Sequence, residues 1–152
     1  MKSAYLFAHK FVMAIVCALF LSVAAFADDT PIAVDQLPAA VKTFVAQKFP
    51  AQKILFAEKD SGFFEKTKYE VRLDDGTKIE LFKDGTWNKV ENKQKGVPAS
   101  FIPKGIADYV KANYATTPVI KVDKEKYGYD VELANDLELK FNEQFQLIGM
   151  DD

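Results

Sequence analysis

Cysteine and histidine are almost absent from this sequence. Each occurs once, at Cys17 and His9, and both lie in the first 27 residues. If those residues are removed as a targeting segment, the remaining chain has no thiol and no imidazole. Such a chain lacks the usual ligands for zinc and copper, lacks a histidine base for a nucleophile and gains nothing from disulfide bonds. We therefore expect no cofactor, no bound metal and no enzyme activity.

Long apolar runs are also absent, except for one near the start. Lys2 and Lys10 precede and flank a nearly unbroken apolar stretch over 11–25, and Ala25-Phe26-Ala27 fits the small-x-small rule for signal-peptide cleavage. The stretch is shorter than the roughly 20 residues of a membrane span. Cys17 lies inside it rather than after the cleavage site, which argues against a lipid anchor. The sequence predicts a signal peptide over 1–27, cleavage after Ala27, and a periplasmic or secreted product without a membrane span.

Positive charge is scarce in the predicted mature chain. Removing Lys2 and Lys10 leaves 18 basic against 22 acidic side chains, a net charge of −4. Nucleic-acid binding requires a concentrated basic face, so we expect no nucleic-acid partner. The net charge does not identify a partner, and we expect an unknown periplasmic protein.

The sequence is repeated in two halves. Residues 37–91 and 102–150 follow the same pattern: an apolar residue followed by proline, a helical stripe, and then alternating apolar and polar residues. The stripe of the first half recurs in the second at a constant offset of 65. It comprises Leu37, Val41, Phe44, Val45 and Phe49 in the first half, and Ile102, Ile106, Tyr109, Val110 and Tyr114 in the second.

This repetition predicts an α+β fold with two tandem repeats, each a helix plus a four-stranded antiparallel sheet, forming one pseudo-symmetric domain. Repeat one covers 28–91, a linker covers 92–101 and repeat two covers 102–152. The first repeat is expected to have a helix over 37–49 and strands over about 53–59, 66–73, 77–83 and 86–91. The second is expected to have a helix over 102–114 and strands over about 118–123, 127–133, 137–143 and 146–150.

Turn residues set the expected register of the hairpins. A three-residue turn at Asp74-Asp75-Gly76 pairs Val71 with Ile79, and the equivalent turn over 134–136 pairs Val131 with Leu139. A two-residue turn at Asp84-Gly85 would pair Phe82 with Trp87 and Glu80 with Lys89. In the second half, the same reading at Gln144-Phe145 pairs Phe141 with Ile148.

Several of these motifs resemble those of the PepSY-like family of exported bacterial proteins. They are Leu37-Pro38, Phe49-Pro50, Tyr69-Glu70-Val71, Asp75-Gly76-Thr77 and 81–87, which reads Leu-Phe-Lys-Asp-Gly-Thr-Trp. The family is similar in fold to the β-lactamase inhibitory protein, which is also built from two helix-plus-four-strand repeats. The resemblance implies protein binding outside the cytoplasm, with inhibition of a peptidase-type enzyme as one form of it. It implies no active-site residues. The second half departs from the motif, because Leu147 stands where Trp87 does.

The candidate partner-binding residues are Phe82, Trp87, Arg72, Glu70, Glu80 and Lys89, which the predicted register places on one face of the first sheet. Aromatic and arginine side chains among mixed charges are typical of interface hot spots. Alternatively, the second half or the loop containing Phe63-Phe64 covers the Phe82–Trp87 pair, which then only stabilises the sheet.

Three catalytic or metal interpretations are weaker. Glu70 and Glu80 face each other and could act as an acid–base pair, but a solvated ion-pair lattice with Arg72 and Lys89 is the preferred explanation. Asp74-Asp75-Gly76 lacks the ligand pattern of an EF-hand calcium loop. A serine–lysine pair at Ser61 or Ser100 has no further support.

Three functions therefore stay open. The preferred one is a non-enzymatic periplasmic binding module, with enzyme inhibition as one possibility. The alternatives are a small-ligand or envelope-stress binding protein with a pocket between the repeats, and an enzyme built on Asp, Glu, Lys and Tyr.

Overall fold

The fold was analysed in a computed structural model that describes residues 29–61 and 66–152. The predicted signal peptide and the Phe63-Phe64 segment lie outside these residues. In the described part, the chain forms two α-helices, two short 3₁₀ helices and nine β-strands. The predicted α+β class is confirmed. The elements are β1 (Thr30–Pro31), η1 (Val34–Gln36), α2 (Ala39–Lys48), β2 (Ile54–Asp60), β3 (Lys68–Leu73), β4 (Lys78–Phe82), β5 (Trp87–Glu91), η2 (Ala99–Phe101), α3 (Lys104–Asn113), β6 (Val119–Glu125), β7 (Gly128–Leu133), β8 (Glu138–Asn142) and β9 (Leu147–Asp151).

All nine strands belong to one antiparallel sheet, in which strand order follows chain order from β1 to β9. The expectation of a separate four-stranded sheet in each half is therefore corrected. Strand β5 pairs with β6 through Lys89–Asp123, Val90–Val122 and Glu91–Lys121, which joins the halves edge to edge. Unpaired edges leave backbone N–H and C=O groups without partners, and pairing satisfies them. Strand β1, which was not predicted, adds two residues to the edge of β2.

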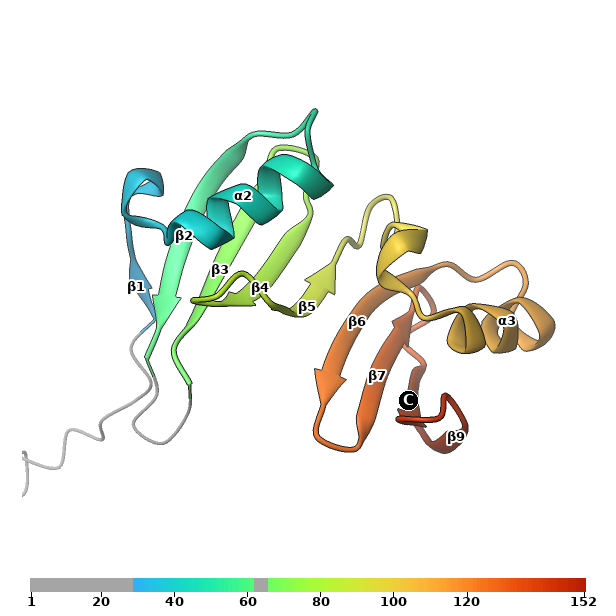
Figure 1. The fold of residues 1–152 in the computed structure, drawn as a ribbon. Helices are drawn as coiled ribbons and strands as arrows, with labels where there is room; N and C mark the ends of the chain where they lie inside the picture. Colours follow the sequence, from blue (N-terminus) through green and yellow to red (C-terminus); the bar gives the residue numbers. More distant parts are fainter. Residues whose placement is uncertain (1–28, 62–65) are drawn as a thin grey trace, which may run out of the picture.

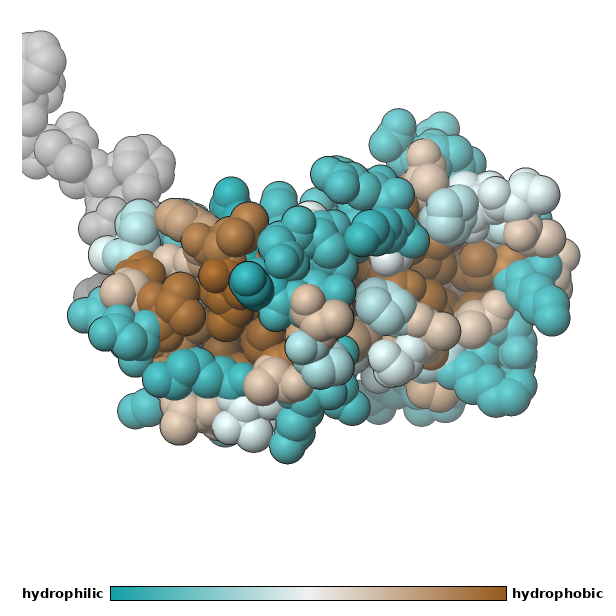
Figure 2. Space-filling model, turned by 90° about the horizontal axis from the view of Figure 1, so that it is seen from above, coloured by the Kyte–Doolittle hydropathy of each residue, from teal (hydrophilic) through white to brown (hydrophobic). Residues whose placement is uncertain are grey.

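Both helices cover the same face of the sheet (Figure 1). They begin directly after Pro38 and Pro103. A backbone N–H at the start of a helix has no acceptor within the helix, so proline, which has no N–H, loses no hydrogen bond there. The apolar stripes of the helices pack on alternate residues of the strands in one continuous core. Among its fully buried side chains are Val41 and Val71 in the first half and Ile106 and Val131 in the second. Seen from above, apolar residues gather over each half, with hydrophilic side chains between them (Figure 2).

The hairpin between β3 and β4 has the predicted register, with Val71 opposite Ile79 and Tyr69 opposite Leu81. Its three-residue turn ends at Gly76, whose φ of 85° is in the left-handed region that glycine adopts without strain. The equivalent hairpin of the second half also has the predicted pairs, Val131–Leu139 and Tyr129–Phe141. Alternation of apolar and polar residues was therefore sufficient to place these four strands.

The following hairpin differs from the prediction. Phe82 N–H donates to the carbonyl of Thr86 (2.8 Å), which closes a three-residue turn ending at Gly85, where a two-residue turn was expected. Trp87 is consequently opposite Leu81 rather than Phe82. A β-bulge at Asn88 then restores the expected pair of Glu80 with Lys89.

The second half contains the same irregularity. Phe145, with a φ of 60°, closes the turn, and Phe141 pairs with Leu147 instead of the predicted Ile148. Strands β2 and β6 each carry a further register shift, after Ile54 and Val119 respectively. The two halves thus share their bulges as well as their helices.

The segment between the halves is more than a spacer. Phe101, in η2, is 4% exposed and stacks on Phe49 with ring centroids 5.5 Å apart. Its ring centroid also lies 6.1 Å from that of Phe44 and 5.5 Å from that of Trp87, to which it is nearly perpendicular. Asn92 is 2% exposed; its amide donates to Thr77 Oγ1 (2.9 Å) and its carbonyl oxygen accepts two backbone N–H groups. These contacts fix the start of the second half against the core of the first.

Candidate functional site

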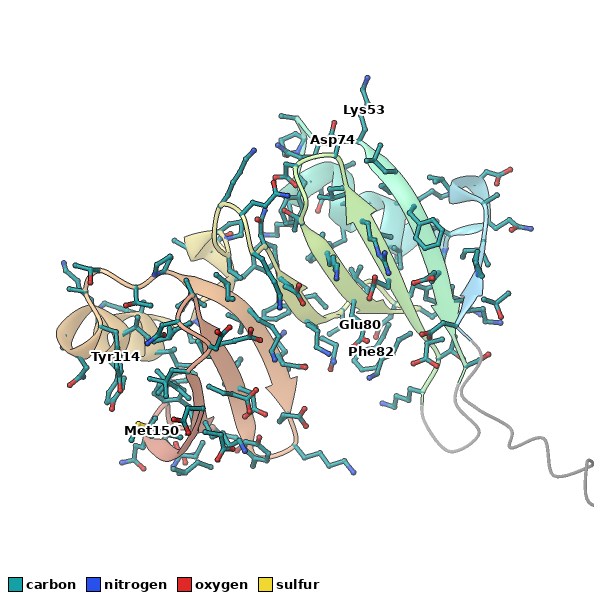
Figure 3. The ribbon with its side chains drawn as sticks, turned by 180° about the vertical axis from the view of Figure 1, so that it is seen from behind. Lys53, Asp74, Glu80, Phe82, Tyr114 and Met150 are labelled. Carbon is teal, nitrogen blue, oxygen red and sulfur yellow. The ribbon has the colours of Figure 1, made fainter. Side chains whose placement is uncertain are left out.

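The face of the sheet opposite α2 and α3, here called the uncovered face, carries most of the predicted site residues (Figure 3). Side chains of a strand alternate between faces. Tyr69, Val71, Ile79 and Leu81 are buried under the helix. Their neighbours in sequence therefore point to the uncovered face. Glu70, Arg72, Glu80, Phe82 and Lys89 lie there, and each is at least partly exposed.

Arg72 is the most exposed of the predicted charged residues. Its guanidinium donates to Glu70 (2.7 Å) and Glu58 (3.3 Å), and its Cζ lies 5.2 Å from the centre of the Phe56 ring. The hydrogen bond to Glu70, which outweighs a small desolvation effect, raises the pKa of Arg72. This arrangement presents an exposed aromatic ring beneath a cation held in place by two carboxylates.

Glu70 and Glu80 are directly opposite each other, as predicted. Glu80 has a cation of its own, because Lys68 Nζ lies 3.3 Å from its Oε1, and it also accepts a hydrogen bond from Asn88 (2.7 Å). The two carboxylates thus pair with different cations, Glu70 with Arg72 and Glu80 with Lys68. The geometry agrees with the ion-pair lattice interpretation of these residues.

This lattice extends over both halves. Ion pairs of this kind, within and between strands, contribute modestly to stability when exposed, but here they pair most charges of the uncovered face with an opposite charge. The pairs are Arg72–Glu58, Arg72–Glu70, Lys68–Glu80, Lys78–Glu91, Lys89–Asp123, Lys93–Glu132, Lys121–Glu132, Lys121–Glu138, Lys140–Glu138 and Lys140–Asp151.

Lys89 connects the halves across the junction of β5 and β6. Its Nζ lies 2.9 Å from Asp123 Oδ2, and Asn88 donates to Asp123 Oδ1 (3.2 Å). Desolvation would lower the pKa of Lys89, but the hydrogen bond and charge of Asp123 outweigh it, and the pKa is raised. Asp123 was not selected from the sequence, where it is one of many acidic residues without a distinguishing pattern.

The expected Phe82–Trp87 pair does not form. Phe82 is half-buried on the uncovered face, whereas the bulge at Asn88 places Trp87 on the helix face, where it forms a T-shaped contact with Phe101. The prediction failed because a bulge reverses the alternation on which it relied. The repeated five-residue pattern, Leu73 to Thr77 and Phe82 to Thr86, could have indicated the same turn in both places.

A lysine-rich hollow lies where the two halves meet at one end of the sheet. Its volume is about 480 Å³, and it is lined by Lys66, Lys68, Phe82, Asn88, Lys124, Glu125 and Lys126. A second hollow of about 340 Å³ adjoins it through Lys66 and Phe82, and also has Lys83 and Asp84 on its wall. We call the two together the seam hollow. Its lysines were missed because they are distant in sequence.

The turn aspartates have local structural roles. Asp74 Oδ1 accepts the N–H of Lys53 (3.2 Å) and Asp75 Oδ1 accepts that of Thr77 (3.0 Å). Within 29–61 and 66–152, no group of three or more His, Cys, Asp or Glu side chains is placed to hold a metal ion. In the same ranges, no helix has the length and apolar character needed to cross a membrane.

The family model described as "Putative beta-lactamase-inhibitor-like, PepSY-like" matches residues 27–67 and 67–149. The chain belongs to the PepSY-like family. The resemblance noted from its sequence motifs is thereby confirmed. A comparison with curated proteins gives no significant match.

Three solved structures are similar to this PepSY-like chain over 82% of its length. One is a "putative calcium-regulated periplasmic protein" of Bacteroides thetaiotaomicron, with 39% identity, a TM-score of 0.74 and 98% of that chain covered. Another is a "putative periplasmic protein from DUF2874 family" of Bacteroides vulgatus, with 37% identity, a TM-score of 0.73 and 98% covered. The third, a "putative periplasmic protein of unknown function" of the same organism, has 31% identity, a TM-score of 0.75 and 100% covered. None of these descriptions indicates a catalytic family.

Proposed function

We propose that this PepSY-like chain is a non-enzymatic binding protein of the periplasm, and that it docks a partner protein on the uncovered face of its sheet. One observation carries the proposal: both helices pack on one face, and no described element covers the other. The periplasmic descriptions of three similar structures support the location. Inhibition of a peptidase-type enzyme is one outcome that such docking would have.

The composition of the uncovered face supports docking. Phe56 is 36% exposed under the Arg72 guanidinium, and Phe82 is partly exposed at the seam. Aromatic and arginine side chains contribute most of the energy at protein interfaces. The surrounding charges are already paired within the chain, so a partner that covers them does not have to neutralise them one by one.

The calcium in the description of one similar structure is not carried over to this chain. The turn carboxylates that would be the first candidates, on Asp74 and Asp75, already accept backbone N–H groups, and the described residues contain no acidic cluster that fits a metal ion. Calcium prefers six to eight oxygen ligands, and these turns do not bring that number together.

The test is quantitative cross-linking in periplasmic extract with mature protein. The variant F56A/F82A removes two aromatic rings from the uncovered face. The control is V34A/M150A, because both side chains are also exposed, but Val34 precedes α2 and Met150 pairs with Leu139, which is buried on the helix face. We expect the first variant to lose the partners that wild type captures, and the control to retain them. Equal recovery of all partners by both variants would refute docking on this face.

Trp87, which the sequence pattern placed in the same group, is not used in this test. Its ring packs on Phe101, so that replacing it would perturb the core. Thermal unfolding of each variant checks that F56A/F82A remains folded before its binding is interpreted.

A further inference from the structure

We propose that the seam hollow binds an acidic segment of the partner protein. The inference rests on the proposed function and names the chemistry that the partner presents. Among the described residues, four lysines and one glutamate line the larger hollow; since Lys68 is paired with Glu80, the other three lysines and Glu125 leave a local balance of +2, whereas the mature chain as a whole carries −4. A basic hollow on a protein of net negative charge attracts an acidic group to that place.

Lys124 is the central cation of this hollow. Its Nζ lies 3.6 Å from the centre of the Trp87 ring, it is partly buried, and no described carboxylate lies within ion-pair distance of it. Desolvation by burial lowers the pKa of Lys124. A desolvated cation beside an aromatic ring gains most from an added counterion.

Lys121, on the same strand, has the carboxylate partners that Lys124 lacks among the described residues. It is also partly buried, but its Nζ lies 3.0 Å from Glu132 and 3.4 Å from Glu138. Desolvation alone would lower its pKa, yet these two carboxylates raise it. Within the described residues, carboxylates therefore pair with Lys121 and not with Lys124, and we expect an acidic group of the partner to pair with Lys124.

The remaining walls also favour an acidic chain with apolar side chains. Lys66 and Lys126 are exposed, and Lys66 Nζ lies 5.9 Å from the centre of the Phe82 ring, which forms an apolar surface between the two parts of the hollow. The acidic residues on the wall are Glu125 and Asp84. Asp84 is oriented by its own turn, where Oδ1 accepts the N–H of Thr86 (2.9 Å).

The shape favours a peptide segment over a small ligand. Small-ligand sites bury most of the ligand surface in a single cavity. Here two hollows that are open to solvent, of about 480 and 340 Å³, adjoin through Lys66 and Phe82. An extended segment can follow both, placing carboxylates near Lys124 and Lys126 and an apolar side chain on Phe82.

The chain provides its own reporter for binding. Trp87 is the only tryptophan in the sequence and contacts Lys124 directly. The mature protein is titrated with a capped peptide that alternates glutamate and leucine, and Trp87 emission is followed together with the anisotropy of a labelled peptide. The glutamine version of the peptide and free glutamate are titrated in parallel. We expect saturable binding of the acidic peptide alone, weakened when salt rises from about 50 to about 500 mM.

The variant K124M/K126Q keeps the bulk of the side chains but removes two charges from the hollow. Its control, K48Q/K111Q, removes two exposed charges in the last turns of the helices, and leaves the same net charge. We expect at least a tenfold rise in Kd for the first variant and less than a twofold rise for the second. Anisotropy serves for this comparison because K124M alters the surroundings of Trp87.

Three results would overturn the proposal: equal binding of the glutamine peptide, equal binding by the two double variants, or free glutamate binding as tightly as the peptide. The last would identify a small-anion site. If the peptide fails while F56A/F82A still loses its cross-linked partners, docking on the uncovered face stands and only the acidic segment is refuted.

Discussion

Replacing Phe101 by alanine tests whether the two halves form one cooperative unit. Phe101 lies outside both predicted repeats, yet its ring contacts Phe44, Phe49 and Trp87 of the first half. Removal of a buried phenylalanine side chain costs about 3–5 kcal/mol. Three ring contacts, each worth about 0.5–1.5 kcal/mol beyond buried area, place F101A in the upper part of that range.

The matched control is F56A, which removes the same side chain from the uncovered face, where the ring is 36% exposed. We expect it to cost less than about 1 kcal/mol, as exposed substitutions usually do. Urea unfolding followed by far-UV circular dichroism and by Trp87 emission gives the free energies of unfolding. For F101A, the thermal midpoint should fall by roughly 10–20 °C.

Both probes should report one transition for wild type and for F101A. Equal losses of stability in F101A and F56A would refute the packing argument. Two separated transitions in the wild type, one seen by Trp87 and one by circular dichroism alone, would refute the single cooperative unit.

Three further predictions concern stability. G128A should lower the free energy of unfolding by more than about 2 kcal/mol. Gly128 has a φ of 145°, and a Cβ there would lie 2.2 Å from the carbonyl oxygen of Phe141. G149A is the control and should change the free energy of unfolding little in the same urea titration, because the nearest atom to its Cβ would be 3.5 Å away. N92A should cost about 1–3 kcal/mol by leaving buried polar groups unpaired, measured in urea against the exposed substitution N113A. Burial would raise the pKa of Glu132, but Lys121 and Lys93 outweigh burial and lower the pKa below 4.5. The ionised carboxylate therefore stabilises the folded state above pH 4.5, and this contribution is lost as the pH falls through the pKa of the folded state. The urea midpoint should drop less on acidification in E132Q than in wild type, and equal drops would refute this.

The sequence predicted what depends on regular alternation. The register of Tyr69, Val71, Ile79 and Leu81 followed from side chains that alternate with charged residues, since a shift of one residue would bury the charges. The helical stripes were identified because their spacing repeats at a constant offset. These features are local, and each residue in them has the same role in both halves.

Features that depend on a single extra residue or on distant contacts could not be predicted in this way. The bulge at Asn88 moved Trp87 to the other face, and nothing in alternation marks a bulge. The junction of β5 with β6 could not be inferred either, because Val90 and Val122 fit equally well at the edges of two separate sheets. The Lys124–Trp87 contact depends on that junction, and so the seam hollow was missed.

The strand order has a consequence for how the chain acquires its structure. Since every strand pairs with the one that precedes it, from β1 to β9, no pairing must wait for a segment made much later. Folds dominated by contacts between residues that are close in sequence form quickly. Here the sheet can grow one strand at a time, starting from the N-terminal end of the polypeptide. Besides the permanent edge at β1 and β2, only the most recent strand is then a bare edge, which limits the time during which incomplete molecules can associate through it.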